Sequence, residues 1–142
     1  MQFHVWVLPT GPRPDFRTVA AFLFPAGEDI DADGDAEHPA SRDWTELDLQ
    51  SRGALGARVS VSMEADAPLT LRVSSPSRQM ALGVAYYLTH ESGGEMRDAA
   101  GAPIDMAGLV DELRQGFRLD SRLNAAARSP YHRATRDEPF PR

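Results

Sequence analysis

The sequence predicts a single α+β domain in which helices pack on one face of an antiparallel sheet of four or five strands. Apolar and polar side chains alternate in three consecutive segments, at about 44–50, 55–63 and 69–74. A period of two residues is typical of strands with one buried face. Two further segments, 76–91 and 105–123, repeat apolar side chains at helical spacing. At 142 residues the chain is long enough to bury a core of its own.

The N-terminal elements have separate local signals. Residues 3–8 are apolar on both faces and predict the first strand. Apolar side chains at helical spacing after Asp15 predict a helix, which Pro25 ends. Residues 26–43 have no periodicity and are expected to form a polar, acidic loop before the three alternating strands.

The second half of the chain adds two helices and a short strand. Ser75 suits the N-cap of a helix and Pro76 suits its first residue. The Gly93-Gly94 pair ends this helix, and a short strand follows at 95–98. Asp105 caps the last helix.

This order of elements indicates a ferredoxin-like variant with an added C-terminal helix. One domain is expected at 1–127. Residues 128–142 contain Pro and no periodicity, so they are expected to form a mobile tail.

Composition and charge exclude several classes of function. The chain has no Cys, which excludes disulfides and cysteine-ligated zinc. No segment reaches the roughly 18 consecutive apolar residues of a membrane helix. Residues 1–75 carry a net charge of −6 and residues 76–142 a net charge of 0, which argues against a nucleic-acid binder and is compatible with a basic protein partner or a cation. We expect a cytoplasmic protein that binds neither nucleic acid nor membrane.

The acidic loop has part of the pattern of a calcium loop. Asp29, Asp31 and Asp33 occupy ligand positions one, three and five, and Gly34 occupies the turn position. Position twelve is Ala40, where a bidentate Glu is expected. Three interpretations stay open: a solvated loop, an acidic loop that binds a partner, and a weak calcium site.

The solvent-facing side of the sheet is the second candidate surface. If the apolar residues of each strand point inward, the polar and aromatic residues between them share the outer face. They are His4, Trp6, Trp44, Glu46, Asp48, Arg58 and Arg72. Exposed Trp and Arg are enriched in binding hot spots. The alternative is that both Trp residues belong to the core, where large aromatic side chains are usually found.

No catalytic or cofactor motif is present. The four His residues have no metal-ligand spacing, and the His90-Glu91 pair is followed by Gly94 where a zinc-protease helix needs its second His. The chain has no Gly-x-Ser-x-Gly elbow, and without any Lys it cannot form a phosphate-binding loop of the Gly-Lys-Ser/Thr type. No cofactor is therefore expected.

Residues 80–101 read MALGVAYYLTHESGGEMRDAAG and resemble the second half of small bacterial immunity proteins of polymorphic toxin systems. In that group a helix of the type Ala-Leu-x-x-Ala-x-x-Leu runs into a Gly-Gly stop, a short strand and an Asp-containing turn. The matching residues are Ala81, Leu82, Ala85, Leu88, Gly93, Gly94 and Asp98. The strand at 44–49 also looks like one of that group. The resemblance implies an acidic single-domain inhibitor that binds and blocks one cognate toxin, and it assigns no binding residue.

Three hypotheses for function follow. The leading one is an immunity-type inhibitor that occludes a basic toxin domain through the outer sheet face or the acidic loop. The second is a small enzyme or small-molecule-binding domain with a pocket between sheet and helices, for which His4, Glu46, Asp48 and Arg58 are the polar set. The third is a structural subunit that pairs through its sheet edge or its open face.

Overall fold

The computed structural model describes residues 2–141 apart from 26, 35–38, 54–56 and 136. Within this part of the chain the elements are β1 (Phe3–Leu8), α1 (Phe16–Leu23), β2 (Ile30–Gly34), β3 (Leu47–Ser51), β4 (Arg58–Asp66), β5 (Leu69–Ser75), α2 (Arg78–Ser92), β6 (Glu95–Arg97), α3 (Met106–Gly116), α4 (Leu119–Arg128) and the 3₁₀ helix η1 (Pro130–Arg133). The strands form one sheet in the order β2-β3-β4-β5-β1-β6, with every neighbouring pair antiparallel. The predicted α+β class is confirmed, but the sheet has six strands instead of four or five.

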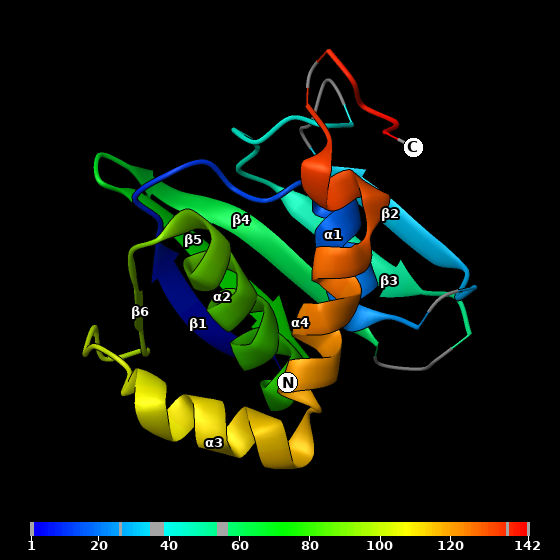
Figure 1. The fold of residues 1–142 in the computed structure, drawn as a ribbon. Coiled ribbons are helices and arrows are strands. Elements are labelled where there is room, and N and C mark those ends of the chain that lie inside the picture. The colour runs from blue at the N-terminus through cyan, green and yellow to red at the C-terminus, as the bar shows by residue number, and fades with distance from the viewer. Residues whose placement is uncertain (1, 26, 35–38, 54–56, 136, 142) are drawn as a thin grey trace.

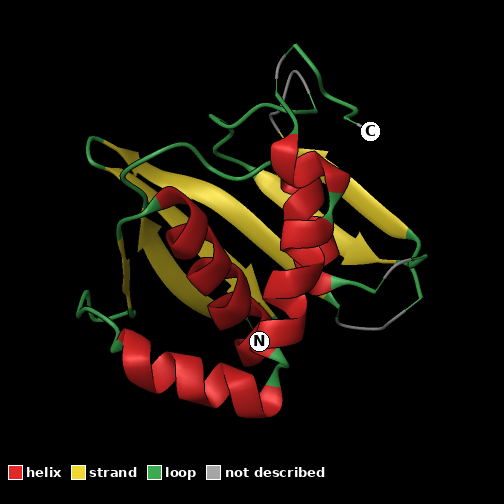
Figure 2. Cartoon of the chain, viewed as in Figure 1, coloured by secondary structure: helices red, strands yellow, loops and turns green. Residues whose placement is uncertain are grey.

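The helices lie on one side of the sheet and leave its other side open (Figures 1 and 2). Helix α2 packs across β1 and β5, and α1 and α4 lie side by side. None of the described helices combines the length and apolarity needed to cross a bilayer.

The core lies between the sheet and these helices. Alternate strand residues point into it and are buried: Val5, Val7, Leu47, Leu49, Val59, Val61, Leu71 and Val73. Helix α2 is buried around most of its circumference, because the sheet covers one side and α1 and α3 cover another. Gly83 on α2 lies against the ring of Phe117, and a Cβ there would overlap that ring.

Strand β2 lies within the segment that was expected to be a loop. Ile30 and Ala32 alternate with Asp31 and Asp33 along it, and it pairs with β3 in register. This alternation is short, and Asp is unfavourable in strands, so the sequence pattern did not indicate a strand here. Strand β2 is an edge of the sheet, where charged side chains are common because they oppose pairing with another chain.

The remaining strand boundaries differ from the expected ones by a few residues. The strand predicted at 44–50 begins at Leu47, and the strand predicted at 55–63 is observed at Arg58–Asp66. Residues 55 and 56 of the latter prediction lie outside the described residues.

The single helix predicted at 105–123 is two helices, α3 and α4. Arg118 has φ 56° and ψ 48°, the left-handed conformation, and this residue turns the chain between them. The turn allows both Phe117 and Leu119 to be buried. The apolar spacing continues through this turn at a helical period, so the break between α3 and α4 could not be predicted from the sequence.

The segment expected to be a tail packs against the rest of the fold. Helix η1 lies against α1 and α4, and Ala134 is buried. Arg42 Nη2 donates to the carbonyl of Ala134 at 3.0 Å. The packed structure therefore extends beyond the boundary expected at 127.

Candidate functional site

The open face of the sheet brings together most of the residues predicted for it. Trp6 lies directly opposite Arg72 of β5 on one side and Arg97 of β6 on the other. Residues in register on neighbouring strands point to the same face, so Trp6 has an arginine beside it on each neighbouring strand. Trp6 is half-buried, and its Nε1 donates to the carboxylate of Glu64.

The acidic half of this face lies on β2 and β3. Asp33 is opposite Asp48 in the sheet register. A shallow hollow of about 320 Å³ opens beside them, and its polar lining is Asp33, Glu46, Asp48, Ser60 and Ser62. This part of the surface carries negative charge, so it favours a cationic group of a partner.

Arg58 limits how strong that charge is. Its Nη2 pairs with Asp48 Oδ2 at 2.6 Å, and its Nε donates to Oδ1 at 3.1 Å. These contacts raise the pKa of Arg58, chiefly through the hydrogen bond to Asp48. Both side chains are exposed enough for solvent to screen the pair, so the pair orients the Asp48 carboxylate more than it stabilises the fold.

Asp29 and Asp31 do not form a calcium site with Asp33. All three lie along an extended segment, where Asp29 and Asp33 are about 13 Å apart at 3.3 Å per residue. Arg52 pairs with both Asp29 and Asp31, and its hydrogen bond lowers the pKa of the Asp31 carboxyl. Within the described residues no cluster of three or more side chains could hold a metal ion. The described residues do not support the calcium interpretation, because β2 is extended where a calcium loop curls. Asp35 and Glu37, at positions seven and nine of that loop, lie outside the described residues.

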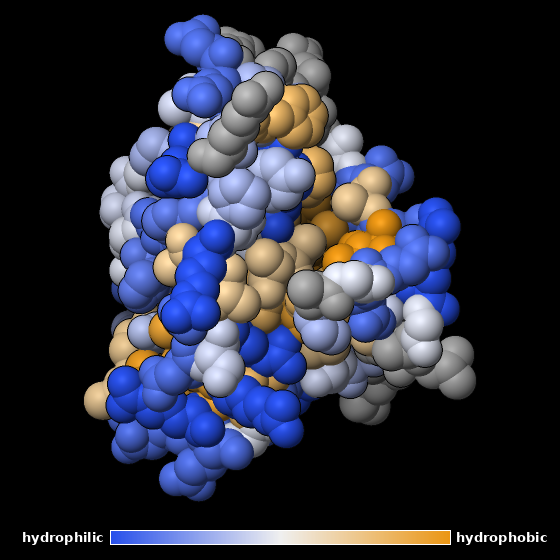
Figure 3. Space-filling model, turned by 45° about the vertical axis from the view of Figure 1, so that its right-hand side comes forward, coloured by the Kyte–Doolittle hydropathy of each residue, from blue (hydrophilic) through white to orange (hydrophobic). Residues whose placement is uncertain are grey.

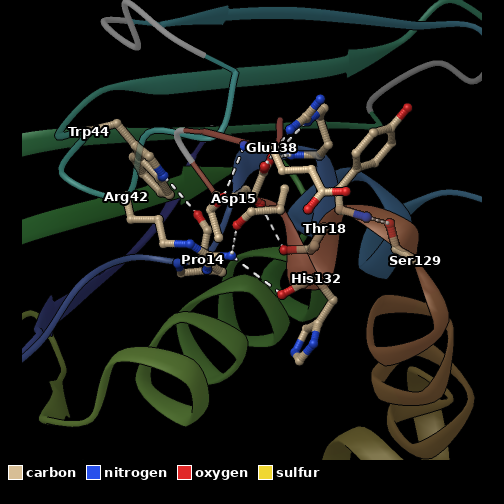
Figure 4. Close-up of polar contacts among 12 residues, drawn as sticks. Pro14, Asp15, Thr18, Arg42, Trp44, Ser129, His132 and Glu138 are labelled. Carbon is tan, nitrogen blue, oxygen red and sulfur yellow. Dashed lines mark hydrogen bonds and ion pairs between the residues drawn. The ribbon is translucent and has the colours of Figure 1, made fainter. Parts of the chain in front are cut away.

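Trp44 does not belong to the open face. It precedes β3 and is 2% exposed, and its Nε1 donates to the carbonyl of Pro14 at 2.9 Å (Figure 4). Its own carbonyl accepts from Arg13 Nε at 2.9 Å. The prediction that Trp44 faces outward with Glu46 and Asp48 assumed that the strand began at residue 44. Because β3 begins at Leu47, the two-residue period of a strand does not decide where the Trp44 side chain points, and the prediction for Trp44 was wrong.

A buried polar junction at the start of α1 was missed by the sequence analysis. Asp15 is fully buried, caps α1 and accepts from Arg17 Nη2 at 2.7 Å. The Arg17 guanidinium lies over the ring of Tyr131 at 4.0 Å and over that of Phe140 at 5.0 Å. Figure 4 shows the C-terminal segment meeting α1 at this junction. The sequence analysis placed the start of a helix after Asp15, but no pattern joins Arg17 to residues more than a hundred positions away.

The polar set of the enzyme hypothesis is not assembled. His4, Ser74, Ser60 and Asp48 lie on successive strands of the sheet, so three strand spacings, about 14 Å, separate His4 from Asp48. His4 Nδ1 lies 2.6 Å from Ser74 Oγ. None of the described carboxylates bonds to His4 to orient it as a general base.

No protein-family model, curated protein or solved structure matches this chain. Function therefore has to follow from the surfaces of the molecule.

Proposed function

We propose that this chain is a protein-binding module that binds its partner through the open face of the sheet. The observation that supports this is the composition of a face without a helix over it: Trp6 between two arginines on one half, and the carboxylates of Asp31, Asp33 and Asp48 on the other. Tyr, Trp and Arg are the side chains enriched at binding hot spots. A strand scaffold also holds such side chains in fixed positions, which lowers the entropic cost of binding.

The charge distribution fits a basic partner. The acidic hollow beside Asp33 and Asp48 would take a cationic side chain, and the net charge of −6 would accelerate encounter. Association should therefore slow as ionic strength rises. A partner bound to this face would be inhibited because the chain covers part of its surface, and this requires no catalytic group on the chain.

An immunity-type inhibitor of a bacterial toxin is the specific class that we propose. The residues that resemble such proteins, 80–101, form most of α2, the Gly93-Gly94 turn and β6. These elements build the scaffold, and the open face leaves the binding residues free to differ between cognate pairs. The resemblance and the open face therefore support one proposal from separate parts of the chain.

Affinity capture from the cell lysate of its source, followed by mass spectrometry, tests the proposal. The tagged wild type should retain one basic protein in stoichiometric amount, and Arg72→Glu should lose it because the change removes the guanidinium beside Trp6, one of the side chains proposed to contact the partner. Arg114→Glu on α3, also exposed, is the matched control for charge reversal on the covered side and should retain the partner. A partner retained by both Arg72→Glu and Trp6→Ala would contradict the proposed surface.

Coexpression separates the inhibitor from other binding modules. If the captured partner inhibits growth when expressed alone, wild-type protein should restore growth and Arg72→Glu should not. A partner that is harmless alone would refute the inhibitor and leave only the binding function.

Pairing of two copies through the sheet edge is less well supported. Strand β2 forms one edge and carries Asp31 and Asp33 along it. A second β2 alongside would bring like charges together, which is unfavourable in neighbouring strands. A monomer in light scattering would agree with this reading.

The ferredoxin-like class is supported by the strand order. Without β2 and β3, the chain runs β-α-β-β-α-β and its strands lie in the order β4-β5-β1-β6. That is the split β-α-β arrangement. We propose a ferredoxin-like core that the β2–β3 hairpin extends at the β4 edge.

A further inference from the structure

A hollow between α1 and α4 lies on the helical side of the molecule, away from the open face. It has a volume of about 570 Å³, within the range of small-molecule sites. Apolar side chains form much of its wall, among them Ala21, Phe24 and Ala125. Figure 3 shows apolar residues recessed between hydrophilic ones on the side that carries these helices.

Three arginines and no acidic residue line this hollow. Arg118, Arg122 and Arg128 come from α4 and the turn before it. Arg118 directly precedes the helix, Arg122 lies in its first turn, and Arg128 is its last residue. None of the described carboxylates forms an ion pair with any of them. Unpaired positive charge is therefore concentrated here, in a chain whose net charge is −6.

Arg122 is the most constrained of the three. Its Nε donates to the carbonyl of Phe117 at 2.6 Å, and its Nη1 donates to the carbonyls of Phe22 and Leu23 at 3.2 and 2.5 Å. The guanidinium also lies 3.9 Å from the centroid of the Phe117 ring. Partial burial, with a smaller contribution from the charge of Arg118, lowers the pKa of Arg122. A half-buried cation held only by neutral carbonyls would gain from an anion brought close to it.

Arg118 provides an independent sign that this corner is constrained. It is the only non-glycine residue with positive φ among the described residues. Such a conformation is strained for a residue with a Cβ, and strained residues are concentrated at functional sites. Glycine would relieve the strain, yet the position has an arginine that lines the hollow.

We propose that the hollow between α1 and α4 binds a small ligand that joins a phosphate or carboxylate group to an apolar body. The arginines bind the anionic group, since guanidinium matches carboxylate and phosphate geometry. The apolar wall of α1 and α4 takes the body, which excludes water from those contacts. The site is separate from the open face, so it adds a ligand to a module proposed to bind protein.

Titration with octyl phosphate, followed by amide NMR shifts and calorimetry, tests this site. The compound has both parts of the proposed ligand and is used below its aggregation concentration. Saturable binding should shift the amides of residues 21–24 and 118–129. Inorganic phosphate and octyl glucoside, which carry the head and the tail separately, should each bind at least about tenfold more weakly, as expected for the loss of one charge-assisted contact or the apolar area.

Charge variants locate the site. The double variant Arg118→Gln/Arg128→Gln should weaken octyl phosphate binding by about tenfold or more. Arg78→Gln/Arg114→Gln removes two exposed arginines from α2 and α3 and is the matched control, so it should bind as the wild type does. Arg122 is left intact because its bonds to backbone carbonyls support the fold.

Each other outcome overturns the proposal. If octyl glucoside binds as tightly as octyl phosphate, the arginines do not contribute to binding. If inorganic phosphate binds as tightly as octyl phosphate, the apolar wall does not contribute. Shifts outside α1 and α4, or no saturation by octyl phosphate, place no such ligand in this hollow.

Discussion

His132 Nε2 lies 2.9 Å from Glu91 Oε1, although the two residues are 41 positions apart in the sequence. The same carboxylate oxygen accepts a hydrogen bond of 3.1 Å from the phenol of Tyr87, one turn earlier on α2. Tyr87 is buried and Glu91 half-buried. This chain of contacts joins the C-terminal segment to the central helix.

Tyr87 should make stability fall at alkaline pH. Burial is the main cause that raises the pKa of its phenol well above the ordinary value, and the charge of Glu91 adds to it. As the pH rises, the Tyr87 phenol therefore loses its proton in the unfolded chain, at a pKa of about 10, before it does so in the folded protein. The contribution of Tyr87 to the free energy of unfolding is therefore complete below about pH 10 and decreases above it, by up to about 1.4 kcal/mol per pH unit.

The composition makes this effect easy to assign. The chain has no Lys and no Cys, so no other type of its side chains has an ordinary pKa near that of tyrosine. Urea unfolding across this range should show a steep loss for the wild type and for Tyr86→Phe, and a shallower one for Tyr87→Phe. The same slope in all three proteins would show that Tyr87 is not the group responsible.

Removing the ring of Tyr131 should destabilise the junction at the start of α1. The ring covers the Arg17 guanidinium at 4.0 Å, and a cation–π contact of this kind contributes about 1 kcal/mol. Tyr131→Ala should lower the free energy of unfolding by about that amount in urea titrations. Tyr131→Phe keeps the ring and should match the wild type, and an unaffected Tyr131→Ala would mean that the C-terminal segment does not pack as described.

The two tryptophans should differ in fluorescence. Trp44 is buried with its Nε1 bonded to Pro14, and Trp6 is half-buried on the open face. Trp6→Phe should therefore emit at short wavelength and resist acrylamide, and Trp44→Phe should emit at longer wavelength and be quenched readily. Trp44→Phe should also lose about 2 kcal/mol of stability, because the Pro14 carbonyl is left without its donor. Equal quenching of both variants would disprove the assignment.

Gly83→Ala should destabilise the protein although Ala is the better helix former. The new methyl group would overlap the ring of Phe117, which is itself buried. Overpacking of this kind costs about 2 kcal/mol, more than the gain of about 1 kcal/mol from helix propensity. Thermal and urea unfolding measure the difference.

Gly116→Ala is the matched control for that substitution. Its methyl group would meet only the end of the Gln79 side chain, which can move. It should leave stability unchanged or raise it by up to about 1 kcal/mol. A Gly83→Ala protein as stable as this control would show that Phe117 does not pack on α2.

The sequence by itself determined the elements with strong local signals. The alternation in β4 and β5, the Asp105 cap and the glycine stop after α2 follow from interactions within a few residues, and all appear in the fold. The side-chain period also placed His4, Trp6, Asp48, Arg58 and Arg72 on one face, because a strand allows only two orientations.

Tertiary structure decided the rest, because the deciding contacts are far apart in the chain. Strand β2 exists because β3 supplies its hydrogen-bond partners, and this pairing joined the acidic segment and the outer face into one surface. Trp44 is buried because Pro14 and Arg13 meet it from another loop. Arg118, Arg122 and Arg128 line a hollow only because α1, about a hundred residues earlier, packs beside α4. Periodicity reports which side of an element is apolar, and packing alone decides what that side meets.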